Sequence, residues 1–393
     1  MFDFDHLPDR RNTASLKWDV PENELPLWVA DMDFQAAPCI REAFMKRIDH
    51  GVFGYNIIPD SWYEAYQNWW QRRHGFFMER EWLLFVTGVV PGLSSIIRKL
   101  TTPNENVLIQ TPVYNIFFNS IRNNGVRILE NPLIYDEETC RYEIGFEDLE
   151  KKLADPQTTV MILCNPHNPV GKIWGRDTLA RIAELCEKHH VIVISDEIHC
   201  DITAPSKEYV PFLSVSETAR KVGISLIAPT KCFNLAGLQT AAICVPDPVL
   251  HHKVWRSINT DEIAEAGSFA LIAVEAAFGQ GEPWLEELRV YLEDNKTFVR
   301  NFLEKELPMI SLVPSEATYL LWLDCRKLPH PAKGTLADAL EAFLRKEAKV
   351  YLTSGSEYGE SGDEFLRLNI ATSRERLAEG MRRLKRGIDQ FIG

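Results

Sequence analysis

The sequence predicts an α/β protein whose large domain is a mainly parallel sheet of seven strands flanked by helices. Short apolar runs alternate with helix-length amphipathic segments from about residue 83 onward. Apolar residues make up 45% of the 393 residues, which is ample for a large core. The seven runs expected to form strands are residues 83–86, 107–109, 126–129, 160–163, 191–194, 224–227 and 241–245.

Helices are expected between these strands and in the last quarter of the chain, which predicts a smaller α+β domain. The helical segments are residues 61–73, 91–100, 114–124, 178–190 and 283–306. Strand-like segments follow at residues 317–323, 350–353 and 365–370. A final helix is expected from Thr372, because Thr372 and Glu375 have the spacing of a capping box.

The length of the chain predicts about two domains. We expect a large domain over residues 46–285 and a small domain over residues 286–393. Residues 1–45 have weak periodicity and are expected to form an arm that packs with the small domain.

Charge and cysteine usage narrow the classes of partner. The formal net charge of −13 disfavours nucleic acid or an anionic membrane as the main partner. The eight cysteines are scattered without a CxxC pair, so neither a disulfide framework nor a zinc site is expected. No apolar stretch approaches a membrane span and the N-terminus lacks an apolar signal core, which predicts a cytoplasmic protein.

Lys231 occupies an unusual place for a lysine. It follows the apolar run 223–227 and precedes a turn rich in small residues. Lysines rarely enter apolar interiors, and a desolvated lysine loses its proton and attacks carbonyl carbons. This is the chemistry that an enzyme dependent on pyridoxal phosphate (PLP) uses; the alternative is a strand end whose amine lies in solvent.

Several other polar segments follow predicted strands, and ligands of open α/β sheets lie at the carboxyl ends of the strands. The turn Thr87-Gly88-Val89-Val90 leads into a helix, whose N-terminal N–H groups suit a phosphate; an ordinary turn is the alternative. The segment 164–171 contains two Asn-Pro pairs and a glycine, which indicate a rigid polar loop. Asn168 in this loop is suited to donate a hydrogen bond to a phenolate oxygen.

Four further side chains are candidates for binding a cofactor or substrate. Asp196 ends a buried strand and suits the protonated pyridine nitrogen of PLP; a capping aspartate is the alternative. Tyr114 is suited to stack on a planar ring, against the default of a core or surface tyrosine. Arg367 lies in an apolar pattern and suits either a substrate carboxylate or an internal salt bridge. His199 has no partner at metal-ligand spacing, so a metal is not expected.

Taken together, these segments resemble the fold-type I PLP enzymes, and within them the branch of the MalY/PatB-type cystathionine β-lyases. The glycine turn, the aromatic residue, the Asn-Pro loop, the aspartate, the lysine and the late arginine occur in the order of that superfamily. The resemblance runs nearly end to end. The segments typical of the branch are 17–19 (KWD), 28–34 (WVADMDF), 53–55 (FGY), 195–199 (SDEIH) and 231–238 (KCFNLAGL).

The resemblance implies roles around the cofactor ring. Lys231 holds PLP covalently and later acts as the general base. Asp196 pairs with the pyridine nitrogen, Asn168 with the phenolate oxygen, and Tyr114 stacks on the ring. His199 stands where aminotransferases usually have a tyrosine that contacts the ring oxygen.

The resemblance also implies a phosphate site and a shared dimer. Val89 and Val90 offer backbone N–H groups, Thr230 offers a hydroxyl, and Tyr55 reaches the phosphate of the neighbouring subunit in a homodimer with two shared active sites. Arg367 binds the substrate α-carboxylate. The chain departs from many superfamily members, which have a serine and an arginine as phosphate ligands where Ala228 and Gln239 stand here.

The implied activity is that of a carbon–sulfur β-lyase. It splits cystathionine or another cysteine S-conjugate by α,β-elimination into a thiol, pyruvate and ammonia. An aminotransferase would use the same residues up to loss of the α-proton, and no motif separates the two. A regulatory binding protein with the same fold is a third possibility, which the intact Lys231, Asp196 and Arg367 disfavour.

Overall fold

All seven predicted runs form strands of one sheet in the computed structural model, which describes residues 2–393. The strand order is β2-β10-β9-β8-β7-β3-β4, and only the pairs of β10 are antiparallel. The predicted mainly parallel sheet is therefore confirmed. The strands are β2 (Leu83–Val86), β3 (Asn106–Ile109), β4 (Arg127–Glu130), β7 (Thr158–Cys164), β8 (Ile192–Asp196), β9 (Gly223–Ile227) and β10 (Ala241–Cys244).

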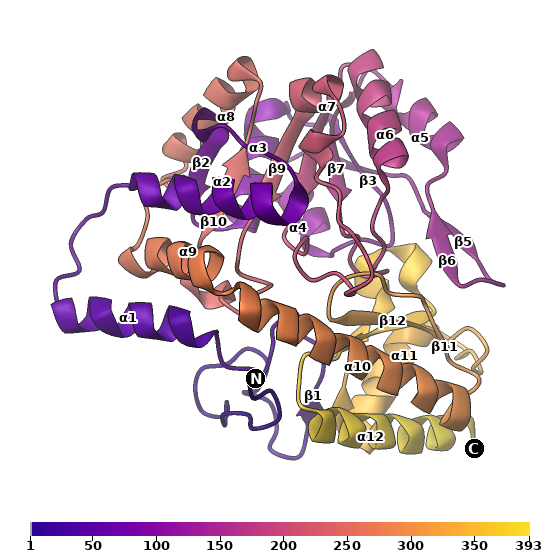
Figure 1. The fold of residues 1–393 in the computed structure, drawn as a ribbon. Coiled ribbons are helices and arrows are strands. Elements are labelled where there is room, and N and C mark those ends of the chain that lie inside the picture. The colour runs from indigo at the N-terminus through magenta and orange to yellow at the C-terminus, as the bar shows by residue number, and fades with distance from the viewer. Residues whose placement is uncertain (1) are drawn as a thin grey trace.

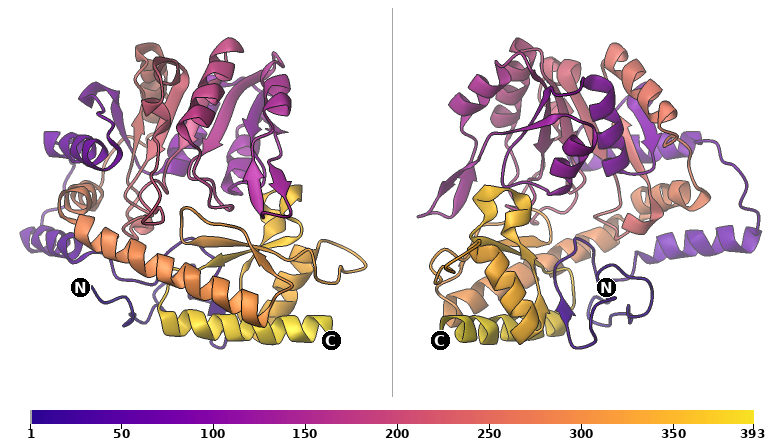
Figure 2. Two further views of the ribbon diagram at one scale, coloured as in Figure 1. Left: turned by 45° about the vertical axis from the view of Figure 1, so that its right-hand side comes forward. Right: turned by 180° about the vertical axis from the view of Figure 1, so that it is seen from behind.

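Helices cover both faces of this sheet, as Figures 1 and 2 show. The side chains of β7 alternate between two apolar clusters: Met161 and Leu163 enter one, whereas Val160 and Ile162 enter the other. Burial on both faces explains why the strands are uninterrupted apolar runs in the sequence. The helices are α2 (Asp60–His74), α3 (Val89–Leu100), α4 (Ile116–Asn123), α5 (Phe146–Leu153), α6 (Arg176–Lys188), α7 (Glu217–Val222), α8 (Pro248–Thr260) and α9 (Ser268–Gln280).

A second, antiparallel sheet with the order β11-β12-β15-β14 lies in the C-terminal part of the chain. Its strands are β11 (Ser311–Leu312), β12 (Leu320–Asp324), β14 (Thr353–Ser354) and β15 (Phe365–Asn369). The accompanying helices are α10 (Glu282–Glu306), α11 (Leu336–Phe343) and α12 (Arg374–Ile392). A small hairpin of β5 (Ile134–Asp136) and β6 (Arg141–Glu143) projects from the part of the molecule that contains the large sheet.

Two local predictions for this region differ from the structure. Strand β12 begins three residues later than expected, because Thr318 has a positive φ of 70° that interrupts the extended backbone. Helix α12 is capped by Ser373 and not by Thr372: the Ser373 hydroxyl accepts a hydrogen bond from the Arg376 N–H at 3.3 Å. The N-cap of α12 therefore lies one residue later than the sequence predicts.

The N-terminal segment runs beside both parts of the molecule. Strand β1 (Leu25–Pro26) pairs in parallel with β13 (Val350–Tyr351), and α1 (Pro38–His50) packs against α9. The division of the chain at residues 45 and 285 stays a prediction; these positions fall inside α1 and α10. Within residues 2–393, no helix combines the length and apolarity needed to cross a bilayer.

Candidate active site

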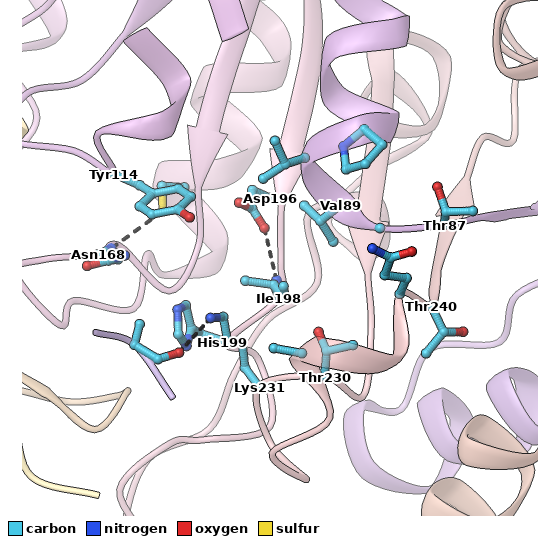
Figure 3. A pocket seen from close by; sticks show the side chains of 17 residues that line it. Thr87, Val89, Tyr114, Asn168, Asp196, Ile198, His199, Thr230, Lys231 and Thr240 are labelled. Carbon is cyan, nitrogen blue, oxygen red and sulfur yellow. Dashed lines mark hydrogen bonds between the residues drawn. The ribbon is translucent and has the colours of Figure 1, made fainter. Parts of the chain in front are cut away.

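A cavity of about 310 Å³ opens at the carboxyl ends of the parallel strands (Figure 3). This is the edge where ligands of open α/β sheets bind. Eight of the predicted site residues line it, although they come from segments far apart in the sequence. They are Val89, Val90, Tyr114, Asn168, Asp196, His199, Thr230 and Lys231.

Lys231 lies shortly after the end of β9, and its amine faces this cavity. The Nζ atom donates a hydrogen bond to the Ala30 carbonyl oxygen at 2.7 Å. Burial, and after it the positive charge of Arg367, lower the pKa of Lys231 to about 8, although the charges of Asp31 and Asp196 oppose the shift. A substantial neutral fraction of this amine is therefore available near neutral pH, as a nucleophile or base requires.

Asp196 is the last residue of β8, and its carboxylate is buried at the wall of the cavity. Its Oδ1 accepts a hydrogen bond from the Ile198 N–H at 3.1 Å. Burial raises the pKa of Asp196 to about 7, although that backbone hydrogen bond and the nearby charge of Lys231 oppose the shift. A cationic partner placed beside Asp196 would strongly favour the ionised form of this carboxyl over the protonated form.

Arg367, on β15, is buried beside the cavity, and no carboxylate within residues 2–393 forms an ion pair with it. Its Nη2 donates to the Trp28 carbonyl at 2.9 Å, and its Nη1 approaches the Asn168 Oδ1 at 3.4 Å. The Nε atom is buried and has no hydrogen-bond partner among the described residues. No ion pair of Arg367 occurs within residues 2–393, so the internal salt bridge considered from the sequence is absent there. The guanidinium is thus able to receive an incoming carboxylate.

His199 and Tyr114 form neighbouring parts of the wall. His199 Nδ1 is buried without a partner in the described chain, and burial lowers the pKa of the ring to about 3. The imidazole is therefore neutral at physiological pH. Tyr114 is partly exposed to the cavity, with its ring edge-on to Phe117, and lies beside Asn168 and Asp196 in Figure 3.

The opposite wall is formed by the first turn of α3. Val89 and Val90 begin this helix, and Gly88 precedes them as an N-cap that offers no side-chain acceptor. The first N–H groups of any helix lack intrahelical partners, so this wall presents donors to an anion. Thr230 adds a hydroxyl at the same cavity.

Sequence reasoning assigned no role to Ala30 and Thr240, which also line the cavity. Thr240 has a buried hydroxyl without a partner in the described chain, and its position after the noted Gln239 was the available signal. Ala30 acts through its backbone carbonyl, so no side-chain pattern marks it. Gln239 also lines the cavity; it has a positive φ of 51° and lies two residues before β10.

Tyr55 lies outside the cavity of its own chain. It is fully exposed, in a loop with the exposed side chains of Val52, Phe53 and Ile57. Its predicted contact with a neighbouring subunit stays a prediction.

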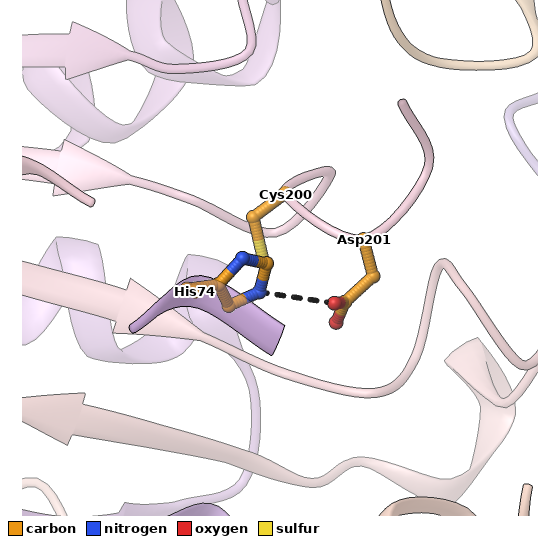
Figure 4. A group of neighbouring side chains, drawn as sticks. All are labelled: His74, Cys200 and Asp201. Carbon is orange, nitrogen blue, oxygen red and sulfur yellow. Dashed lines mark hydrogen bonds and ion pairs between the residues drawn. The ribbon is translucent and has the colours of Figure 1, made fainter. Parts of the chain in front are cut away.

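A second cluster of ligand-type side chains lies near the end of α2 (Figure 4). His74 Nε2 is 3.1 Å from Asp201 Oδ1, with Cys200 beside them. Asp201 also accepts hydrogen bonds from Trp69 Nε1 at 3.0 Å and from Arg73 Nε at 3.2 Å. Burial raises the pKa of the Cys200 thiol well above its usual value, which keeps it protonated. Donors of the described chain thus already pair with the Asp201 carboxylate, as in a structural ion-pair network.

Comparison with known proteins agrees with this geometry. The model of the family "Aminotransferase class I and II" matches residues 22–384. The chain is 41% identical to cystathionine beta-lyase PatB of Bacillus subtilis, over 97% of this chain and 98% of PatB. It is 33% identical to protein MalY of Escherichia coli, over 97% of each chain.

The fold agrees with that of a solved relative. The PLP-bound putative aminotransferase from Clostridium difficile 630 superposes with a TM-score of 0.94 and 37% identity, over 99% of this chain and 100% of that chain. A match of this extent includes both sheets. The chain therefore belongs to the aminotransferase class I and II family, in the branch that holds the MalY- and PatB-type proteins.

Proposed function

We propose that the chain is a PLP-dependent carbon–sulfur β-lyase that converts cystathionine or a related cysteine S-conjugate into a thiol, pyruvate and ammonia. The observation that carries this proposal is the cavity amine of Lys231, whose pKa is lowered to about 8, beside the buried Asp196 and near Arg367, whose Nε has no partner among the described residues. The similarity to a protein named cystathionine beta-lyase, at 41% identity, supports the choice of reaction.

The polar groups of the cavity fit PLP at both ends of that molecule. Asp196 is a buried carboxylate that a pyridinium nitrogen would compensate, and the first turn of α3 offers N–H donors for a phosphate. His199 Nδ1 and Thr240 Oγ1 are buried polar atoms without partners in the described chain, which a polar cofactor would satisfy. Lys231 would bind it covalently, and Asn168 and Tyr114 would contact its ring.

Bound PLP supplies an electron sink for the electron pair released at the substrate Cα. Arg367 binds the α-carboxylate through two parallel N–H···O bonds and so orients the substrate. The substrate amine would displace Lys231 from its covalent bond, and the freed neutral amine of Lys231 would then remove the Cα proton as general base. A thiolate leaves from Cβ, and water converts the remaining three-carbon unit into pyruvate and ammonia.

The product distribution tests this proposal. Purified protein loaded with PLP should release pyruvate and free thiol from cystathionine without any 2-oxo acid. The control is Lys231→Ala, which should release neither at a comparable rate.

The rival function is that of an aminotransferase. The relative from Clostridium difficile carries that description. Activity that appears only after a 2-oxo acid is added would establish the rival and exclude the lyase. Protein without any absorbance of a lysine–PLP adduct, even with added PLP, would instead favour a binding protein of the same fold.

We also infer a homodimer in which the loop around Tyr55 contacts the partner subunit. Val52, Phe53 and Ile57 expose large apolar side chains in that loop, and a second copy would bury them. Sedimentation should therefore report a dimer. Tyr55→Phe should weaken PLP binding in that dimer, because the hydroxyl is proposed to reach the partner's phosphate site. The cytoplasmic location and the domain boundaries are likewise proposals that rest on the sequence.

A further inference from the structure

Residues 28–34 form an irregular segment between β1 and α1, here called the strap, whose carbonyl groups are held by side chains. Irregular buried backbone requires such partners, because no strand or helix supplies them. The carbonyl acceptors and their side-chain donors are Trp28 (Arg367 and Thr353), Val29 (Asn369), Ala30 (Lys231 and Tyr319), Asp31 (Lys17 and Asn369), Met32 (Arg10 and Asn234) and Phe34 (Asn234).

One side of the strap is bonded to the loop that carries the reactive lysine. Lys231 Nζ donates to the Ala30 carbonyl at 2.7 Å. Three residues later, Asn234 Nδ2 donates to the Met32 carbonyl at 3.0 Å and to the Phe34 carbonyl at 2.8 Å. The position of the Lys231 amine is therefore defined by strap backbone that the same loop holds in place.

The other side of the strap is bonded to β15 of the small sheet. Arg367 and Asn369 are two residues apart on this strand, so their side chains project from the same face. Arg367 Nη2 donates to the Trp28 carbonyl at 2.9 Å, and Asn369 Nδ2 donates to the carbonyls of Val29 and Asp31 at 2.5 and 2.7 Å. The Asn369 contacts thus flank Ala30 on both sides.

A buried ionic cluster anchors the strap near its C-terminal end. The Asp33 carboxylate, which is fully buried, lies 3.0 Å from Lys17 Nζ, 2.7 Å from Trp18 Nε1, 3.1 Å from Arg10 Nη1 and 3.2 Å from Arg376 Nη1. Displacing this carboxylate would take from the buried Lys17 its nearest anionic partner, at a large energetic cost. The strap is thus a rigid support.

We propose that the strap is a positioning element for the reaction, which places the Lys231 amine through the Ala30 carbonyl and the carboxylate-binding Arg367 through the Trp28 carbonyl. The two contacts lie two residues apart on one backbone. One rigid segment thus sets the distance between the guanidinium that binds the α-carboxylate and the amine that must reach Cα. This inference rests on the proposed lyase function.

The chemistry of the contact suits a base. A carbonyl oxygen only accepts hydrogen bonds, so it binds an N–H of Lys231 and leaves the lone pair of the neutral amine directed elsewhere. Tyr319 donates to the same oxygen at 3.0 Å, which fixes the direction of the acceptor. Asn369 is a positioning residue in this scheme, because it holds the peptides on both sides of Ala30 without lining the cavity.

The test compares two buried asparagines that make the same kind of contact. Asn369→Leu removes two hydrogen bonds to the strap, and also the Oδ1 that accepts from the Ala371 N–H at 2.8 Å. The matched control is Asn295→Leu: Asn295, on α10, donates at 3.0 Å to the carbonyls of Ile370 and Thr372, also two residues apart, and forms no hydrogen bond with the strap within residues 2–393. Both changes should lower the melting temperature, because each removes two buried hydrogen bonds.

The first readout is the pH titration of the absorbance of the lysine–PLP adduct in the PLP-loaded protein. The Ala30 carbonyl favours the protonated nitrogen of Lys231, so Asn369→Leu should lower the midpoint by about half a pH unit to one unit. Asn295→Leu should keep the parent midpoint. The charged and titratable groups that face Lys231 are Asp31, Asp196, His199 and Arg367, and both variants retain them.

The second readout is steady-state kinetics with cystathionine. Asn369→Leu should lower kcat about tenfold and raise KM severalfold, since it disturbs the supports of Lys231 and Arg367 together. Asn295→Leu should stay within about twofold of the parent per folded molecule. Equal changes in both variants, or a parent-like Asn369→Leu, would show that the strap only stabilises the fold.

Thr353→Val gives the test a milder form should Asn369→Leu not fold. It removes one hydroxyl that donates to the Trp28 carbonyl at 3.2 Å. We expect a smaller midpoint change in the same direction and a raised KM, and a variant identical to the parent in both would overturn the proposal. If the parent released no thiol at all, the lyase function would fail, whereas the absorbance midpoints would still report on the strap.

Discussion

Asp196 and Asp201 are two buried aspartates five positions apart in the sequence, yet their surroundings are opposite in character. Asp201 receives donors from Trp69, Arg73 and His74, which hold the pKa of its carboxyl at about 2 against the effect of burial. Asp196 receives one backbone N–H, and burial raises its pKa to about 7.

The difference separates a structural site from a functional one. The network around Asp201 is satisfied within the chain, so it contributes stability and has little capacity for a ligand. The cavity around Asp196 retains polar atoms without partners in the described chain, at His199 and Thr240, and Arg367 Nε beside it is another. The convergence of such atoms with groups of shifted pKa at one cavity distinguishes the candidate active site.

The largest expected effect is that of Lys231→Ala. Turnover should fall by about a thousandfold or more, because both the covalent attachment and the general base are lost. PLP should still bind noncovalently through the α3 wall and Asp196. Rates with cystathionine and the amount of PLP retained on dialysis measure this. Near-normal activity of the variant would refute the account of the cavity.

The two aspartates should respond oppositely to removal of their charge. Asp196→Asn should lower kcat by about a hundredfold with little loss of stability. Asp201→Asn should instead lower the free energy of unfolding by about 3 kcal/mol, because Arg73 is left with a broken buried pair, while kcat per folded molecule stays near the parent value. Urea denaturation and steady-state kinetics separate the outcomes. A kinetic defect in Asp201→Asn equal to that of Asp196→Asn would remove the distinction.

A smaller effect is expected at the arginines of the two regions. Arg367→Lys should raise the KM for cystathionine about tenfold, because an ammonium group cannot make the two parallel bonds of a guanidinium. Arg73→Lys should leave KM unchanged and lower the melting temperature, since its partners are Asp201, Glu282 and Glu286. A raised KM in Arg73→Lys would show that its network takes part in substrate binding.

The smallest effect is a difference in the pH dependence of stability. Asp196 binds its proton more tightly in the folded chain, so in PLP-free protein its contribution to stability should decline as pH rises from about 4 to about 7. Added PLP should abolish this decline. Asp201 has a depressed pKa, so its contribution should be present above about pH 4 and lost as pH falls toward 2. The free energy of unfolding, measured for Asp196→Asn and Asp201→Asn across this pH range, shows which aspartate causes each part of the pH dependence.

Much of the fold and of the cavity could be predicted because both depend on local patterns. The seven strands are uninterrupted apolar runs, and the polar residues that follow them meet because the ends of parallel strands lie at one edge. The cap of α12 was misplaced to Thr372 because adjacent Thr372 and Ser373 both suit that role, and only the local geometry distinguishes them.

The pattern of residues in the sequence was sufficient to predict the large sheet. It was also sufficient to select Lys231, Asp196 and Arg367 as functional residues and to predict that they share one site. Contacts between distant segments decided the rest. The acceptor of Lys231 is a backbone carbonyl 201 positions away, and Asp196 and Asp201 differ in pKa because of donors from α2. Such properties arise from burial and from the partners that folding brings near, and no local periodicity encodes either of them.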